Sequence, residues 1–232
     1  MSRRELVGFD PEHFRKKRDR GVACDPAGAF REAFRTNLWG GESRSGPGSS
    51  AEQTSRLQTL MPALCQRLGV RRLLDVPSGD FSWMANVDLQ GARYIGGDLV
   101  PEIVERNRSC HARADREFVT LDLTRTPLPA ADLLLCRDCL VHLSHADVQA
   151  ALGNIARSPV SWLLTTTFPA EPENVDIVTG DWRPIDLTRP PFGLPEPTEL
   201  LNEGCIEQGG AFADKSLGLW PVSVLADRFP AS

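Results

Sequence analysis

Hydrophobic and polar positions along the middle of the chain follow two alternating patterns. Short apolar runs at residues 71–76, 93–98 and 131–137 read as buried strands, and the stretches between them carry apolar residues at helical spacing. Strands of the buried type that alternate with helices form βαβ units, and these units require a parallel sheet. The pattern therefore predicts an α/β fold that is Rossmann-like and doubly wound.

The same reasoning places the other elements of the main domain. Further strands are expected at 117–121 and 161–168, and helices at 51–69, around 81–88, at 101–113 and at 145–158. Ser144 is expected to cap the last of these helices, because Asp147 occupies the capping-box position. The tail differs, since TELLNEG (198–204) and KSLGLWPV (215–222) flank a glycine-containing connection. These two segments predict an antiparallel strand pair at one edge of a mostly parallel sheet.

The first fifty residues have a different character. Asp-Pro pairs at 10–11 and 25–26 are typical of helix starts, since aspartate caps the helix and proline fits its first turn. A glycine- and serine-rich loop follows at 40–50. We therefore expect an N-terminal helical cap with this loop over residues 1–50 and the main domain over 51–232, with a proline-rich lid loop at 169–197.

Composition and charge narrow the class of protein. The chain has 232 residues, of which 41% are hydrophobic, and this suits one domain with a substantial core. A net charge of −5 argues against general binding of nucleic acid, and no apolar run has the length of a signal peptide or a membrane span. We expect a cytoplasmic protein without a membrane or nucleic-acid partner, whose six cysteines are reduced thiols.

The turn after the first strand, in RRLLDVPSGDFSWM (71–84), raises the question of the ligand. A dinucleotide site needs several glycines so that a pyrophosphate can approach bare backbone, and here only Gly79 is present. Acidic residues end three successive strands, with Asp98 lying 23 residues after Asp75 and Asp122 following the next strand. A carboxylate at position 98 can accept both ribose hydroxyls. A cationic nucleoside without phosphate, such as S-adenosyl-L-methionine (SAM), fits this pattern, although the same acids could simply cap helices.

Three segments resemble the motifs of the class I SAM-dependent methyltransferases over roughly residues 50–222: LLDVPSGDF, YIGGDL and TLDLTRTPLPAADLLLCRDCLVHL. The resemblance implies a SAM site in which Asp98 binds the ribose, Asp122 and Leu123 border the adenine, and Cys136 and Arg137 lie beside the methionine part. It also assigns cofactor contacts to the first and second motifs, at Asp75, Pro77, Ser78, Gly79 and Leu99. NLWGGESRSGPGSS and GDWRPIDLTRPPFGLPEP resemble a smaller bacterial subgroup that is loosely associated with specialised metabolites and surface glycans.

The segment CRDCLVHLSH (136–145) carries the residues suited to catalysis. Its cysteines and histidines lack the long gap of a structural zinc site, so no metal is expected. His142 follows a strand end and has a side chain suited to general-base catalysis. If the turn is helical, Asp138 lies four residues away and can orient the imidazole. We therefore expect His142 to be the base and Asp138 its orienter; the alternative is a histidine that only packs there.

The lid loop and the end of the cap supply expected substrate contacts, namely Trp39, Trp182 and Arg183. The resulting hypothesis is a SAM-dependent methyltransferase that acts on an oxygen or nitrogen atom of a small polar metabolite. Other SAM chemistry remains open. An NAD(P)-dependent oxidoreductase and a non-catalytic Rossmann-like domain that binds a nucleoside or a partner are the alternatives. The sequence does not indicate an oligomeric state.

Overall fold

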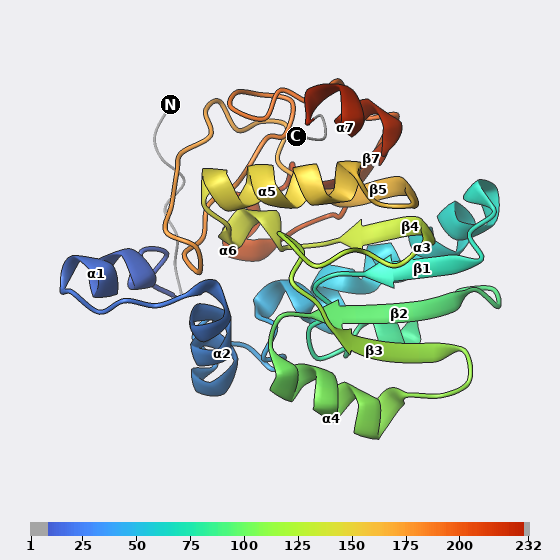
Figure 1. Ribbon diagram of the computed structural model, residues 1–232, viewed down its shortest axis with the longest axis horizontal. Coiled ribbons are helices and arrows are strands. Elements are labelled where there is room, and N and C mark those ends of the chain that lie inside the picture. The colour runs from blue at the N-terminus through green and yellow to red at the C-terminus, as the bar shows by residue number, and fades with distance from the viewer. Residues whose placement is uncertain (1–8, 230–232) are drawn as a thin grey trace.

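The computed structural model describes residues 9–229, and its centre is one seven-stranded sheet of order β3-β2-β1-β4-β5-β7-β6 (Figure 1). The strands are β1 (Arg72–Asp75), β2 (Arg93–Asp98), β3 (Arg116–Thr120), β4 (Ala131–Cys136), β5 (Val160–Thr167), β6 (Glu199–Asn202) and β7 (Ser216–Pro221). The first five are parallel, whereas β7 runs antiparallel to β5 and β6 antiparallel to β7. The predicted doubly wound sheet and its antiparallel edge pair are confirmed.

The strand order creates a crevice beside β1. The chain passes from β1 outward to β2 and β3, then returns to lay β4 on the other side of β1. Ligands of open α/β sheets bind at such a reversal point, outside the carboxyl ends of the strands. The crevice lies where the sequence places the acids and the turn that contains Gly79.

The helices are α1 (His13–Asp19), α2 (Pro26–Thr36), α3 (Ala51–Leu68), α4 (Pro101–His111), α5 (His145–Ala156), α6 (Glu207–Gly210) and α7 (Ser223–Arg228). Short 3₁₀ turns lie at η1 (Pro47–Ser49), η2 (Met84–Asn86) and η3 (Leu140–His142). Two of the expected caps form, since the side chains of Asp25 and Ser144 accept hydrogen bonds from the amides of Gly28 and Asp147. The helix start expected at Asp10 and Pro11 is wrong, because α1 begins at His13 and no side chain caps it. No described helix is both long and apolar enough to cross a membrane.

The helix expected around 81–88 is wrong. Phe81 has a φ of 60°, in the left-handed region, and only the 3₁₀ turn η2 follows it. The left-handed backbone directs the Phe81 ring into the core against Tyr94 and Phe118, whose ring centroids lie 5.0 and 5.2 Å away. This buried aromatic packing overrides the helical propensity of the segment.

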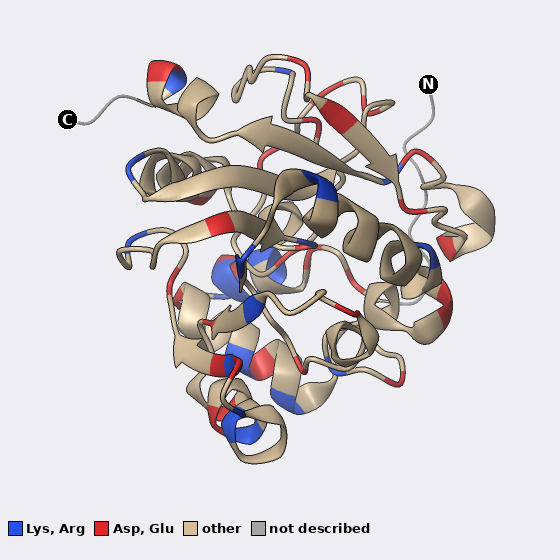
Figure 2. Cartoon of the chain, turned by 90° about the vertical axis from the view of Figure 1, so that its right-hand side faces the viewer, with Lys and Arg blue, Asp and Glu red and all other residues tan. Residues whose placement is uncertain are grey.

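Two hydrophobic clusters cover the two faces of the sheet. Neighbouring residues of a strand point to opposite faces, so Leu73 joins the cluster that contains Leu57 of α3, and Leu74 joins the one that contains Val148 of α5. Charged residues occur mainly in helices and loops, with acidic and basic positions interspersed (Figure 2). Because both faces of the sheet are packed in this way, the positions of the strand ends are fixed.

The N-terminal cap lies at the carboxyl ends of the strands, with α2 next to the ends of β2 and β3 (Figure 1). The cap and the lid loop are joined at Asp181, whose carboxylate accepts hydrogen bonds from the Phe14 and Arg15 amides of α1 at 2.7 and 3.1 Å. Trp182 also donates its amide to the Pro11 carbonyl. These bonds place the cap and the lid loop over the same crevice.

Candidate functional site

A cavity of about 1140 Å³, measured to its open mouth, occupies the crevice at the carboxyl ends of β1, β2, β3 and β4. We call it the main cavity. It collects most of the site residues that the sequence predicts: Trp39, Asp75, Pro77, Ser78, Gly79, Asp98, Leu99, Asp122, Leu123, Arg137, Asp138 and His142.

Asp98 stands at the end of β2 with its carboxylate held in place. One oxygen accepts a hydrogen bond from the Val100 amide at 2.9 Å, and the other accepts one from the Gly79 amide at 3.2 Å. Burial raises the pKa of this carboxyl to about 6, against the lowering effect of these amide bonds. Each carboxylate oxygen retains acceptor capacity on the cavity side, so Asp98 can take two hydroxyl hydrogens.

Asp75, at the end of β1, has a different partner. Its carboxylate accepts a hydrogen bond of 2.6 Å from the Tyr94 hydroxyl, and burial raises its pKa to about 7. Asp122 serves its own turn, accepting from the Thr124 amide and pairing with Arg125. Among these three strand-end acids, Asp98 is held by main-chain amides, whereas Asp75 and Asp122 are bound to other side chains.

The turn that contains Gly79 is shaped by the loop at 40–50. Gly79 has a φ of 52°, and a Cβ there would collide with the Ser45 hydroxyl. Ser45 accepts a hydrogen bond from the Asp80 amide, and Ser43 donates one to the Asp80 carboxylate at 2.8 Å. The glycine is thus required both by its backbone conformation and by the close approach of this loop.

The chemistry of the main cavity fits SAM. The Ser78 hydroxyl is buried, lines the cavity and has no hydrogen-bond partner among the described residues. Leu121 and Leu123 supply an apolar wall next to Asp98, as an adenine ring requires. An orphaned hydroxyl, an acceptor carboxylate and an apolar wall together match a nucleoside.

Cys136 does not face this cavity. Its side chain is fully buried in the hydrophobic cluster on the α5 side of the sheet, so the predicted contact of Cys136 with the methionine part of SAM does not involve this side chain. The alternation of a strand sends residue 136 into the core and residue 137 to the opposite side. Arg137 does line the cavity.

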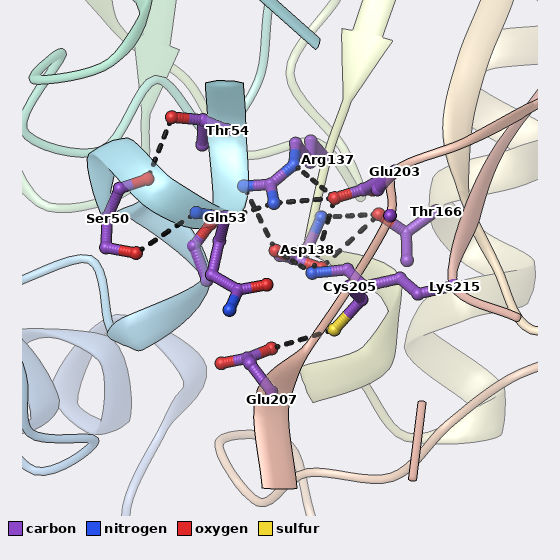
Figure 3. Close-up of polar contacts among 12 residues, drawn as sticks. Ser50, Gln53, Thr54, Arg137, Asp138, Thr166, Glu203, Cys205, Glu207 and Lys215 are labelled. Atoms are coloured by element: carbon purple, nitrogen blue, oxygen red, sulfur yellow. Dashed lines mark hydrogen bonds and ion pairs between the residues drawn. The ribbon is translucent and has the colours of Figure 1, made fainter. Parts of the chain in front are cut away.

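Arg137 belongs to a buried charge cluster with Asp138, Glu203 and Lys215 (Figure 3). Its guanidinium pairs with Glu203 at 2.7 Å and with Asp138 at 3.2 Å, and Lys215 pairs with Asp138 at 2.7 Å. Burial raises the pKa of Asp138, but Arg137 and Lys215 outweigh it and hold that pKa well below its usual range. The four charges balance, so the cluster joins the end of β4 to β7 and to the segment after β6.

His142 lies between the charge cluster and the cap. Its Nδ1 is 2.9 Å from the Asp181 carbonyl oxygen, and a carbonyl can only accept, so Nδ1 carries the proton of the neutral ring. Nε2 then has a lone pair, and no described residue donates to it. Burial lowers the pKa of His142 to about 4, which keeps the ring neutral at physiological pH.

The expected orienting role of Asp138 is wrong. Asp138 has a φ of 50° and the segment after it forms the 3₁₀ turn η3, so Asp138 and His142 do not share one face of an α-helix. The carboxylate pairs with the charge cluster instead. The Asp181 carbonyl and the Trp39 ring, whose centroid is 4.6 Å from that of the imidazole, fix the His142 ring.

A second cavity of about 590 Å³ adjoins the first, and we call it the aromatic cavity. Trp39, Asp138 and His142 line both cavities, and Trp182 lines the second. Arg183 lines neither, because its guanidinium donates to the carbonyls of Leu140, Leu143 and Val175. The structure therefore does not bring Arg183 together with the other predicted substrate contacts, and this side chain anchors the lid loop to η3.

Sequence reasoning missed Lys215 and Glu203. Lys215 is one of three lysines in the chain and opens an apolar strand segment, a position where an unpaired charge would be costly. That signal pointed to a buried ion pair. Glu203 has no comparable signature, since its partners are distant in the sequence. The described residues contain no cluster of three metal-binding side chains.

Comparisons with known proteins agree with this geometry. Residues 74–159 match the family model for the methyltransferase domain, and no curated protein sequence matches the chain. Human N-acetylserotonin methyltransferase in complex with SAM has a TM-score of 0.51 at 15% identity, over 84% of this chain and 66% of that chain. The [4+2]-cyclase SpnF has a TM-score of 0.54 at 17% identity, over 71% of this chain and 69% of that one.

The family match covers residues 74–159, less than half of the chain, and the solved structures share its fold; both agree with the resemblance of the sequence motifs to the class I SAM-dependent methyltransferases. The chain spans just under two thirds of the human enzyme's length, and the solved structures share its fold at low identity.

Proposed function

We propose that the protein transfers a methyl group from SAM to an oxygen or nitrogen atom of a small polar metabolite. The observation that supports this best is the position of His142, in the wall shared by the main cavity and the aromatic cavity. SAM, when bound, supplies a methyl group already activated on a positive sulfur. The chain has to orient the acceptor, remove its proton and exclude water.

The residues proposed to hold the cofactor follow from their contacts. Asp98 accepts the ribose hydroxyls, Ser78 supplies its unpartnered hydroxyl, and Leu121 and Leu123 cover the adenine. A pyrophosphate fits less well, because Ser45 closes over the single glycine of the turn. This favours SAM over a nicotinamide dinucleotide.

His142 is proposed as the general base. Its neutral ring carries the hydrogen on Nδ1, so Nε2 can accept the acceptor's proton. Asp138, whose charge is balanced, is proposed to fix the wall beside this base through Arg137 and Lys215. Trp39 contacts the imidazole and faces both cavities, so it is proposed to hold the acceptor against the base.

The environment of the protein is part of the same proposal. The basic residues of α1 are engaged locally, with Lys16 pairing with Asp10 and Lys17 with Glu32. This pairing supports a small-molecule acceptor rather than a nucleic acid. A cytoplasmic location remains a prediction from the sequence.

Ligand-induced thermal stabilisation tests the cofactor assignment. S-adenosylhomocysteine (SAH) should raise Tm, whereas NAD and NADP should not, because a ligand that binds only the folded state stabilises it by mass action. Asp98→Ala should abolish the SAH shift, and Asp88→Ala, in an exposed turn, should retain it. A shift with NADP alone, or an undiminished SAH shift in Asp98→Ala, would contradict the assignment.

A further inference from the structure

Aromatic rings form a large part of the wall of the aromatic cavity. Five Phe and Trp rings line it: Phe9, Trp39, Phe168, Trp182 and Phe212. They come from the N-terminal segment, the end of the cap, the start and the middle of the lid-loop region, and the connection to β7. The rings therefore meet only because the fold brings these distant segments together.

The rings form a fixed array around Trp182. Its centroid lies 6.3 Å from Phe9, 6.2 Å from Phe168 and 5.2 Å from Phe212, with interplanar angles of 90°, 86° and 74°. These are edge-to-face geometries that aromatic pairs favour. Phe168 and Phe212 are almost fully buried, so the array is held from behind. The cavity is therefore pre-formed for a ring.

The polar groups of the cavity define the charge of its ligand. Asp138 and Lys215 face it as a pair at 2.7 Å, and each neutralises the other. Glu207 adds a carboxylate to the wall. No described cation in the wall is left without an acidic partner, so a carboxylate or phosphate on the acceptor would be repelled.

We propose that the methyl acceptor is a planar aromatic compound without negative charge, whose ring carries the hydroxyl or amino group that reaches His142. The proposal rests on the proposed function, since it takes the aromatic cavity as the acceptor site. It narrows the small polar metabolite to one chemical class. Flat rings match the wall, and the single lone pair at His142 Nε2 matches one nucleophilic group on the ring edge.

Calorimetric titration of the SAH-saturated protein tests this with four probes. They are 2-naphthol, its saturated counterpart decahydro-2-naphthol, the anion 6-hydroxy-2-naphthoate and methyl β-glucopyranoside. The aromatic alcohol should bind about tenfold more tightly than the saturated one, because only a planar ring makes offset and edge contacts. It should also bind more tightly than the anion and the glycoside. With SAM in place of SAH, 2-naphthol should yield 2-methoxynaphthalene.

Matched tryptophan variants locate the site. Trp182→Leu should weaken 2-naphthol binding about tenfold. Trp162→Leu, on β5 and outside both cavities, should leave it unchanged. Both variants should keep the thermal shift with SAH, which shows that they are folded and bind the cofactor.

The outcomes separate the two proposals. If the wild type does not bind SAH at all, the proposed function itself is contradicted. Normal SAH binding with equal affinity for the saturated alcohol, tighter binding of the glycoside or no binding of 2-naphthol would overturn only the aromatic acceptor. Equal weakening by Trp182→Leu and Trp162→Leu would likewise contradict the placement in the aromatic cavity.

Discussion

Replacing His142 is the most direct perturbation of the proposed chemistry. The ring lines both cavities, and its Nδ1 is bound to the Asp181 carbonyl. In the proposed reaction its Nε2 lone pair takes the proton of the acceptor. His142→Ala removes the ring. His142→Gln keeps a donor for the carbonyl but supplies no base of comparable strength. Both variants should lose turnover at saturating SAM while keeping their affinity for SAH.

The structure sets the size of this effect and its pH dependence. Burial lowers the pKa of His142 from 6.5 to about 4, which corresponds to about 3 kcal/mol against charging the ring. The ring is thus neutral and active as a base above pH 4, and activity is lost as pH falls through that value. Removing a general base typically lowers the rate by about 100-fold or more, or about 3 kcal/mol.

The assay is the pH profile of kcat at saturating SAM and acceptor. The acceptor is 2-naphthol or another compound that the protein methylates. The kcat of the wild type should be constant from about pH 5 upward. A histidine with an unperturbed pKa near 6.5 would instead give a kcat that still rises between pH 5 and 7. His145→Ala is the matched control, since His145 packs on Phe192 and lines neither cavity. Unchanged kcat in both His142 variants, or an acid limb near pH 6.5, would refute the reasoning.

Two further predictions concern the cofactor pocket and the charge cluster. SAH affinity should fall as pH drops below about 6, because protonated Asp98 can no longer accept both ribose hydroxyls. Calorimetric titration should find this pH dependence in the wild type and not in Asp98→Asn. A wild-type affinity that does not change with pH near 6 would contradict the prediction. Lys215→Met should destabilise the fold by about 3 kcal/mol, since it leaves the buried Glu203 and the half-buried Asp138 to one guanidinium. Its Tm should drop by roughly 10 °C, whereas the exposed Lys16→Met should change little.

Most of the fold could be predicted because its signals are local. Buried strands and capped helices depend on apolar period and on residues such as Ser144 and Asp25, which act within a few positions. The helix expected around 81–88 failed for the opposite reason. The conformation of Phe81 is decided by Tyr94 and Phe118, which reach it only through the sheet.

The site was predictable only where strand ends determine it. Asp98 and the turn that contains Gly79 lie at carboxyl ends, so the topology places them at one edge. The roles of Asp138 and Arg183 were misread because sequence spacing does not reveal which partners a charged side chain meets. Asp138 pairs with Lys215, and Arg183 with three carbonyls.

The loop at 40–50 was predicted as the end of a separate cap, yet its contacts tie it to the catalytic domain. Ser45 closes over Gly79 in the cofactor turn, and the Gly48 carbonyl accepts a hydrogen bond of 2.8 Å from Arg137 of the charge cluster. Trp39, just before the loop, contacts His142. One short segment therefore touches the cofactor pocket, the proposed base and the acceptor cavity. Because each contact lies on a different wall, the cap completes the site, and the two cavities depend on it together.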